Sequence, residues 1–420
     1  MSQTFNQTEH QINRKRLYQK LDSFWHDLYE SEYALYDIAL MTSEEIEEIR
    51  LATNRIGHIF LKMGNLLRSS PDESLLQLDI PKRMLPFIRH RALPIDTVIS
   101  RVDLVRTSEG LKVLELNSDT PTFEKEVFDV NSFICHEFGV GNPNEGLSER
   151  LGNEMRKALA EALHRSKHDE PPYIVFTSHE GHEEDKFTTI FLKDLANVGA
   201  NYVPLHKLRI QEGEGLYDDE GNRIDVLYRQ TYPLEHLIED VSEESGDPIG
   251  EQLLQLVCSD KLIMLNPISA FLLQSKAVQA AIWGMKELDS PYFTETEKQW
   301  ISQYFLPTYL EEDIFIENGM KYVKKPSFGR EGDTVSVFQG TEKLFEDKHK
   351  TYEKSLPVYQ KYVDLPSQQI KTVNGILEGK VLIGSFLING KASGIGLRAG
   401  KQITDNNAYF LPLGIKKGRE

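Results

Sequence analysis

Two short runs in which apolar and polar residues alternate, VISRVDLV and LKVLELN, predict the two strands of a β-hairpin. The polar segment RTSEG separates them and ends in a glycine, which suits a tight turn. Because side chains alternate across a strand, Arg101 and Asp103 share one face of the first strand. Glu115 and Asn117 share one face of the second strand in the same way. The pattern therefore predicts a ribbon with a polar face.

Symmetric closure of this hairpin about Ser108 would place Arg101 opposite Glu115 and Asp103 opposite Val113. Two interpretations of the resulting polar face are open. It is either an ordinary solvated face with a weak cross-strand ion pair, or a set of oxygen ligands of the kind that Mg²⁺ prefers. The segment NSDTPT that follows is rich in hydroxyl and amide groups, and it favours the second interpretation.

Helical and strand periodicities account for most of the remaining chain. A buried strand, a helix and a second strand between residues 173 and 205 predict a βαβ unit, whose loop lies where ligands commonly bind. Both element types recur, which predicts an α/β (α+β) fold. The expected helices cover residues 10–33, 43–67 and 147–165, the expected strands begin near residues 173, 201, 224, 262, 321, 335 and 357, and a second hairpin covers 381–397.

The loop of the βαβ unit, residues 177–186, carries two histidines and four acidic residues. A zinc site is one interpretation of this composition. The spacing matches none of the usual zinc motifs, and a solvated acidic loop is the favoured alternative.

A glycine-containing loop, SFGREGDT, joins the extended segment KYVKKP to the strand VSVF. Such a loop can fold its backbone amides over a phosphate, and Lys325 and Arg330 would add positive charge from either side. The loop matches neither the dinucleotide-binding fingerprint nor the Walker motif. The loop is therefore either a phosphate-binding loop without a familiar nucleotide motif or an ordinary glycine turn between two strands.

Composition narrows the class of protein. The 420 residues carry a formal charge of -17, which argues against binding of nucleic acid through phosphate neutralisation. Cys135 and Cys258 both lie in apolar contexts, and we expect buried thiols in a reducing compartment. The N-terminus lacks the apolar core of a signal peptide, and no run reaches transmembrane length. We expect a soluble cytoplasmic protein without membrane partners, and the oligomeric state stays open.

The motifs RVD, LELNSDTPT, RQTYPLE, LQSKA, KKPSFGREG and GLR occur in the order found in the glutathionylspermidine synthase-like family. The chain resembles the synthetase portion of that enzyme over residues 10–415. The resemblance implies an ATP-grasp fold preceded by a pre-ATP-grasp-like region. The expected regions are a helical scaffold (1–95), a pre-ATP-grasp-like region for substrate and metal (96–260), and an interlocked ATP-grasp nucleotide-binding region (261–420).

The same resemblance implies a role for each matching residue. Arg101 corresponds to the arginine that stabilises the transition state. The implied metal ligands are Asp103, Glu115 and Asn117; the implied substrate-binding residues are Arg101, Thr120, Thr122, Thr231 and Glu184, with Glu183 as a close alternative; and the implied ATP-binding residues are Lys276, Lys325, Arg330, Gln360 and Arg398.

The activity implied by the resemblance is an ATP-dependent carboxylate-amine ligase that uses ATP and Mg²⁺ and passes through an acyl phosphate. Its partners would be a small-molecule acid and an amine, with a thiol peptide and a polyamine as family-level examples. Nothing in the chain corresponds to the family's amidase domain, so we expect no amidase activity. The alternatives are a non-catalytic nucleotide-binding protein derived from this fold and an ATP-grasp phosphotransferase.

Overall fold

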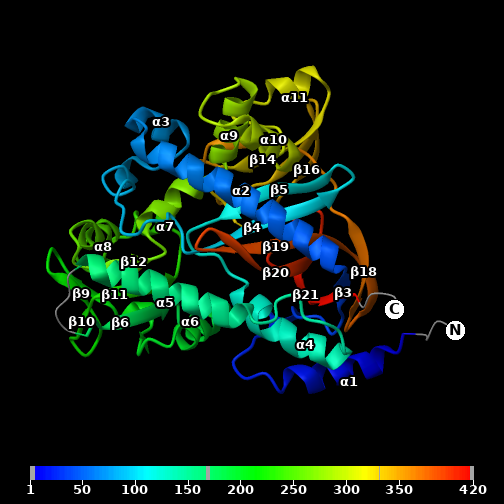
Figure 1. The fold of residues 1–420 in the computed structure, drawn as a ribbon, viewed down its shortest axis with the longest axis horizontal. Coiled ribbons are helices and arrows are strands. Elements are labelled where there is room, and N and C mark those ends of the chain that lie inside the picture. The colour runs from blue at the N-terminus through cyan, green and yellow to red at the C-terminus, as the bar shows by residue number, and fades with distance from the viewer. Residues whose placement is uncertain (1–4, 167–170, 331, 417–420) are drawn as a thin grey trace.

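The computed structural model describes residues 5–166, 171–330 and 332–416. Within these residues three larger sheets are covered by helices, as expected for an α/β protein (Figure 1). The central sheet is antiparallel and has the order β21-β20-β19-β4-β5, with β18 paired to β19. Its strands are β4 (Ile99–Thr107), β5 (Gly110–Asn117), β18 (Ser367–Thr372), β19 (Gly375–Ile388), β20 (Lys391–Gly400) and β21 (Tyr409–Leu411).

Both predicted hairpins lie in this central sheet. The hairpin β4–β5 is confirmed, and so is the later hairpin β19–β20. They are joined because β4 pairs with β19, from Ile99 opposite Ile388 to Leu104 opposite Ile383. The central sheet thus combines strands from the first third and the last third of the chain. The expected division at residues 95 and 260 stays a prediction.

The predicted register of the first hairpin is wrong. Arg101 lies opposite Asn117, and Asp103 lies opposite Glu115, whereas the sequence predicted Glu115 and Val113 as the partners. Residues directly opposite each other share a face, so all four polar side chains still lie on one side of the sheet, as expected.

A β-bulge at Leu114 and the form of the turn explain the difference. The turn closes with Thr107 opposite Gly110, and beyond it Leu104 pairs with Val113. The next pair is Asp103 with Glu115, which leaves Leu114 as the extra residue. The bulge turns the fully buried Val113 into the core and leaves the polar face intact.

The helix α2 (Ser43–Ser69) lies across the central sheet (Figure 1). It begins as predicted, because the Thr42 side chain accepts from the amide of Glu45, and the Glu45 side chain accepts from the amide of Thr42. Its apolar face is buried against the sheet together with Val102 and Leu104 of β4. The opposite face of β4, which carries Arg101 and Asp103, is therefore left for the site.

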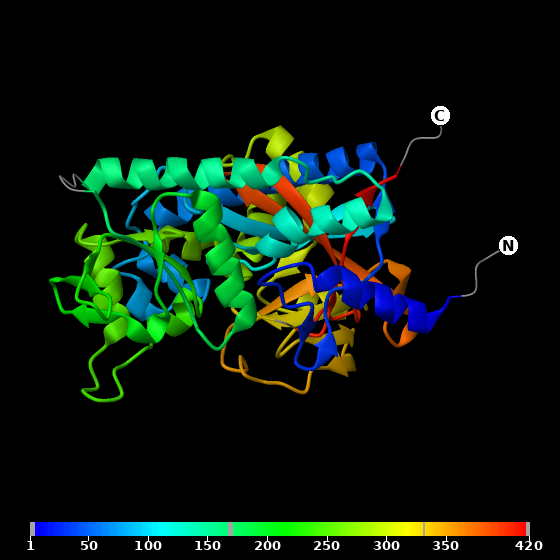
Figure 2. The same ribbon diagram turned by 90° about the horizontal axis from the view of Figure 1, so that it is seen from below.

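The predicted βαβ unit is confirmed as part of a parallel sheet of order β12-β11-β6-β7. Figure 2 shows the long helix α5 along the upper surface of the molecule, and it packs against α6 beside this sheet. The elements are α5 (Leu147–Ser166), β6 (Ile174–Ser178), α6 (Glu183–Ala196), β7 (Asn201–Tyr202), β11 (Val226–Gln230), α7 (Leu234–Leu237), α8 (Ile249–Cys258) and β12 (Ile263–Leu265), with a small antiparallel sheet of β8 (Arg209–Gln211), β9 (Gly215–Tyr217) and β10 (Arg223–Ile224).

The third sheet holds the predicted glycine loop between two of its strands. Its order is β13-β17-β14-β15-β16, and it is antiparallel throughout. The strands are β13 (Thr308–Tyr309), β14 (Lys321–Pro326), β15 (Ser336–Gln339), β16 (Glu342–Glu346) and β17 (Pro357–Lys361), and the neighbouring helices are α9 (Ala277–Glu287), α10 (Glu295–Tyr304) and α11 (Asp313–Glu317).

The first helix is shorter than predicted. The helix α1 covers Gln7–Tyr18, whereas the spacing of apolar residues predicted a helix to residue 33. Arg14 of α1 donates to the backbone carbonyls of His26 and Ala34, which folds the following segment back onto the helix. The segment contains the short strands β1 (Asp27–Leu28) and β2 (Ser31–Glu32), and other short elements are β3 (Ala39–Met41), α3 (Asp72–Gln77) and β22 (Leu413–Ile415).

Two expectations from composition can be compared with the structure. Both cysteines are free, and Cys135 is buried as expected. Cys258 is only half-buried, because it is the last residue of α8, so the prediction of two buried thiols is wrong for this residue. Among the described residues, every helix is too short or too polar to cross a bilayer.

A glycine-lined surface of the central sheet lets the chain after Thr122 approach closely. This chain forms a π-helical turn (Glu126–Val130) that continues into α4 (Asn131–Phe138). A Cβ atom on Gly396 would lie 2.4 Å from Cε1 of Phe123, and one on Gly394 would lie 2.6 Å from Cγ1 of Val127. Side chains at these positions would push the turn away from β20.

We expect Gly396→Ala to lower the free energy of unfolding by about 1–3 kcal/mol, because the new methyl group overlaps the Phe123 ring. Urea denaturation measures the change. Gly284→Ala is the matched control, since it lies in α9 and an added Cβ meets no atom within 4 Å. Equal stabilities of the two variants would contradict this account of the glycines.

Candidate functional site

A cavity of about 1200 Å³ lies beside the polar face of the hairpin β4–β5. Its walls also include the segment after β5, the start of α6, the segment after β11, and the loop between β14 and β15. All the residues that the sequence singled out for a site line this one cavity: Arg101, Asp103, Glu115, Asn117, Thr120, Thr122, Glu183, Glu184, Thr231, Lys276, Lys325, Arg330, Gln360 and Arg398.

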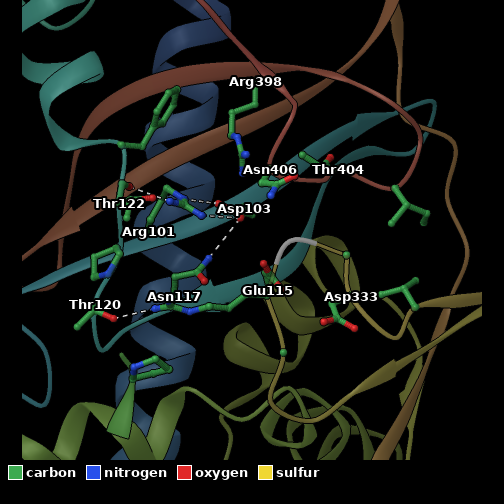
Figure 3. Close-up of a pocket in the computed structure, with 18 of the residues that line it drawn as sticks. Arg101, Asp103, Glu115, Asn117, Thr120, Thr122, Asp333, Arg398, Thr404 and Asn406 are labelled. Carbon is green, nitrogen blue, oxygen red and sulfur yellow. Dashed lines mark hydrogen bonds and ion pairs between the residues drawn. The ribbon is translucent and has the colours of Figure 1, made fainter. Parts of the chain in front are cut away.

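The hairpin wall is organised around Arg101 (Figure 3). Its Nε lies 2.7 Å from Oδ1 of Asp103, and its Nη2 lies 3.1 Å from Oδ2 of the same carboxylate. A third nitrogen donates to the backbone carbonyl of Thr122 at 2.8 Å, and Asn117 donates to Asp103 at 3.3 Å. Arg101 and Asp103 are only 7% and 4% exposed, so this is a buried bidentate ion pair.

Lys276 and Lys325 form a cationic wall beside Glu115. Lys276 precedes α9, and its Nζ lies 3.2 Å from Oε2 of Glu115 and 2.9 Å from the carbonyl of Gly329. Lys325 lies in β14, and its Nζ donates to the carbonyl of Leu114 and to Oε1 of Gln360, each at 2.9 Å. The bulged residue thus supplies the carbonyl that holds the second lysine.

Burial and the neighbouring charges shift the pKa values of Glu115 and Lys325 in this wall. Burial by itself would raise the pKa of Glu115, but Lys276, Lys325 and Arg101 outweigh burial and lower this pKa to about 2. Burial and the charge of Lys276 lower the pKa of Lys325, whereas the charges of Glu115 and Asp103 raise it. The net result is a pKa of about 8. The Glu115 carboxylate is therefore ionised at neutral pH, and Lys325 is close to its titration point.

Arg330 and Arg398 approach the hairpin from a loop and from a strand, respectively. Arg330 follows the glycine of the β14–β15 loop and donates from Nη2 to Oγ1 of Thr120 at 2.9 Å. Arg398 of β20 donates to the carbonyl of Asp405 at 3.1 Å, in the loop that brings Asn406 to the cavity (Figure 3). The two arginines thus reach the cavity from different sheets.

The oxygen atoms of Asp103, Glu115 and Asn117 could supply part of the coordination shell of one hard cation. Mg²⁺ commonly takes one or two carboxylates and completes its shell with water and phosphate. Glu115 leaves 30% of its side chain exposed to the cavity, whereas both oxygens of Asp103 accept from Arg101. Each carboxylate oxygen has a second lone pair, so Asp103 can accept from Arg101 and still coordinate a cation.

The βαβ loop contributes an acidic wall. Both Glu183 and Glu184 lie in the first turn of α6 and line the cavity, so the structure brings both alternatives to the site. His179 and His182 also line it, with ring centroids 5.6 Å apart. No group of three or more His, Cys, Asp or Glu side chains suited to a metal occurs in the described part of the chain.

Sequence reasoning missed the buried pair of Asp119 and Arg229, which fixes the segment after β5. Arg229 of β11 forms an ion pair with Oδ1 of Asp119, and both side chains are almost completely buried. The other oxygen of Asp119 accepts from the amide of Leu234 at 3.0 Å, and Gln230 donates to the carbonyl of Pro121 at 2.9 Å. The motifs RQTYPLE and NSDTPT contain these residues, but their pairing across 110 positions was not visible in the sequence.

The arrangement of the three sheets defines the class of the protein. It is shared with a solved glutathione synthetase-like effector from Globodera pallida in its apo form, with a TM-score of 0.61 over 99% of this chain and 98% of that one. Only 11% of the residues are identical, so this likeness concerns the fold alone. The fold is of the ATP-grasp type, as predicted.

The chain belongs to the family described as glutathionylspermidine synthase preATP-grasp, which it matches over residues 6–416. A relative from Haemophilus influenzae (strain ATCC 51907 / DSM 11121 / KW20 / Rd) is 24% identical over 401 residues, which cover 91% of this chain and 90% of the relative. That protein is named as a proposed acid–amine ligase. The family expected from the motifs is therefore confirmed.

We expect Arg229→Met to lower the free energy of unfolding by about 3–5 kcal/mol, because it leaves the Asp119 carboxylate buried without a counter-charge. Adding Asp119→Asn to this variant should recover part of the loss. Urea denaturation of the two single variants and the double variant tests this coupling. Strictly additive losses would show that the two side chains act independently.

Proposed function

We propose that this protein is an ATP-dependent carboxylate-amine ligase that forms an amide bond through an acyl phosphate and releases ADP. One observation carries the proposal. The oxygen ligands of the hairpin, the cations Lys276, Lys325 and Arg330, and the acids at the start of α6 line the same cavity. Family membership supports an acid–amine ligase of the glutathionylspermidine synthase type.

The cationic wall suits the phosphates of ATP. Lys276, Lys325 and Arg330 would neutralise the phosphate oxygens, and Gln360 would hold Lys325 in position through the hydrogen bond already present. We assign Arg398 to the same ligand from the opposite side. Asp103, Glu115 and Asn117 would hold Mg²⁺, which when bound neutralises charge on the phosphate oxygens.

The hairpin and the segment after it suit the acid substrate. Thr120, Thr122 and Thr231 line the same cavity as Arg101, and their hydroxyl groups would orient the carboxylate for attack on the γ-phosphate. The amine then displaces phosphate from the acyl phosphate through a tetrahedral intermediate that carries negative charge on oxygen. Arg101, held rigid by Asp103, would stabilise this charge.

The acidic wall suits an amine that arrives as a cation. Glu183 and Glu184 lie at the start of α6 and line the same cavity as Lys325 of β14, and they would attract a protonated amine. The cavity thus offers side chains for both a polyanion and a cation. A thiol peptide and a polyamine are the first acid and amine to test.

The decisive experiment measures ADP release with Mg-ATP, small peptides including glutathione, and a panel of alkylamines and polyamines, with mass spectrometry of the products. We expect an amide from at least one pair. Asp103→Asn should lower kcat at least about 100-fold, because it removes the charge that orients Arg101 and binds the cation.

Asp240→Asn is the matched control, because Asp240 lines the rim of the same cavity and is exposed. Its kcat should stay within about twofold of the wild type. Since Asp103 is buried, Glu115→Gln provides a second test at a more exposed position, and it should also lose turnover. ADP release without amide from any pair would refute the ligase and favour a phosphotransferase.

The pKa of Lys325 predicts how nucleotide affinity depends on pH. Phosphate binding favours the protonated lysine, and burial lowers the pKa of this lysine to about 8 in the free protein. The Kd for ADP, measured by calorimetry, should be flat below pH 8 and rise by up to about tenfold per pH unit above it.

Lys325→Met should bind ADP more weakly and lose this inflection. Lys324→Met is the control, because the adjacent side chain lies over the Tyr359 ring and does not line the cavity. An inflection that persists in Lys325→Met would assign the titration to another group.

A further inference from the structure

Two fully buried glutamates lie directly behind the cavity wall that carries Arg101. Glu124 and Glu126 follow Thr122 at the beginning of the helical segment, and the exposed fraction of each is 0%. Glu126 opens the π-helical turn, a rare conformation that is frequent at functional sites. None of the roles proposed above uses these two carboxyl groups.

Tyr33 connects the glutamates to the cavity. It lines the cavity, and its hydroxyl donates to Oε1 of Glu126 at 2.5 Å. Oε2 of Glu126 and both oxygens of Glu124 have no hydrogen-bond partner among the described residues. Buried carboxylate oxygens without partners are costly when ionised, so this site favours groups that hold or take up a proton.

Charged and titratable groups from several elements face the two glutamates. Burial raises the pKa of Glu124 well above its usual value, with Glu126 and Glu184 raising it further and Arg101 lowering it. Burial also raises the pKa of Glu126, while the hydrogen bond from Tyr33 lowers it.

Other charged and titratable groups also face Glu124, Glu126 and Tyr33. Arg398 and Lys125 lower the pKa of Glu126, and Tyr228 of β11 faces Glu124. Burial, followed by the charges of Glu126 and Glu184, raises the pKa of Tyr33 well above its usual value, so its hydroxyl stays protonated and able to donate. Burial therefore raises the proton affinity of both carboxyl groups, and the hydrogen bond from Tyr33 makes Glu126 the one that is connected to the cavity.

The proposed ligase reaction needs such an acceptor, and this inference rests on that proposed function. An alkylamine has a pKa of about 10 and is almost entirely protonated at neutral pH. Its nitrogen has no lone pair for attack until one N–H bond breaks. A solvated carboxylate is a weak base, whereas a buried one with a raised pKa removes a proton more effectively at neutral pH.

We propose that Tyr33 and Glu126 form a proton relay that deprotonates the amine substrate. The ammonium gives one proton to Oη of Tyr33 while the hydroxyl proton of Tyr33 passes to Oε1 of Glu126. Tyr33 is thereby unchanged, Glu126 becomes a neutral acid, and the amine gains the lone pair that attacks the acyl phosphate. The second N–H proton leaves with inorganic phosphate. Glu126 returns its proton to solvent after product release.

Comparison of two nucleophiles tests the relay. Hydroxylamine is already neutral at pH 7 and needs no deprotonation before attack, whereas an alkylamine does. In Tyr33→Phe and Glu126→Gln, kcat with the best alkylamine of the panel should fall at least about tenfold. Hydroxamate formation from hydroxylamine and the same acid should stay within about twofold. The wild-type kcat with the alkylamine should also decline at low pH, and Glu126→Gln should lose this decline.

A second tyrosine–glutamate pair provides the matched control. Tyr36 donates to Glu137 of α4 at 3.0 Å, and neither residue lines the cavity. Tyr36→Phe and Glu137→Gln should leave both rates unchanged.

The ratio of the two rates within one sample does not depend on how much of the variant is folded. An unchanged ratio in Tyr33→Phe and Glu126→Gln would overturn the relay and leave the ligase standing. Absence of both products from the wild-type protein would overturn the ligase and the relay together.

Discussion

The buried ion pair between Arg101 and Asp103 is the constraint on which the cavity depends. A guanidinium removed from water needs acceptors for its donors, and Asp103 supplies two while the carbonyl of Thr122 supplies a third. The same contacts bind the segment after β5 to the central sheet. Through Asp119 and Arg229 this segment is also bound to the parallel sheet, so one chain segment connects two sheets around the cavity.

Within this framework, charges of opposite sign reach the cavity from different elements. Lys276, Lys325 and Arg330 lie on the side of α9 and β14, whereas Glu183 and Glu184 lie on the side of α6. A chain with a formal charge of -17 can therefore present a local cationic surface to a small anion. Lys276 and Lys325 are largely buried, and fixed charges with little water around them act more strongly than they would in bulk water, which suits the chemistry of phosphoryl and acyl transfer.

The local sequence pattern was sufficient to predict most helices and strands and to identify the polar face of the hairpin. Alternation identified the hairpin and its polar face, and helical periodicity placed the start of α2 at residue 43. Local pattern failed where a single residue changed the geometry. The bulge at Leu114 altered the register, and the contacts of Arg14 ended α1 before residue 33, because neither effect leaves a periodic signal in the chain.

The sequence by itself determined the types of most helices and strands, the family, and many of the residues that line the cavity. It could do so because periodicity and motifs are local, and because the motifs kept the order found in the family. Only the tertiary structure decided the pairings across the chain: Tyr33 with Glu126 over 93 positions, Asp119 with Arg229 over 110, and Lys325 with the carbonyl of Leu114 over 211. Such contacts depend on how three sheets pack around one cavity, and burial in that packing, rather than residue type, sets the protonation of the groups involved.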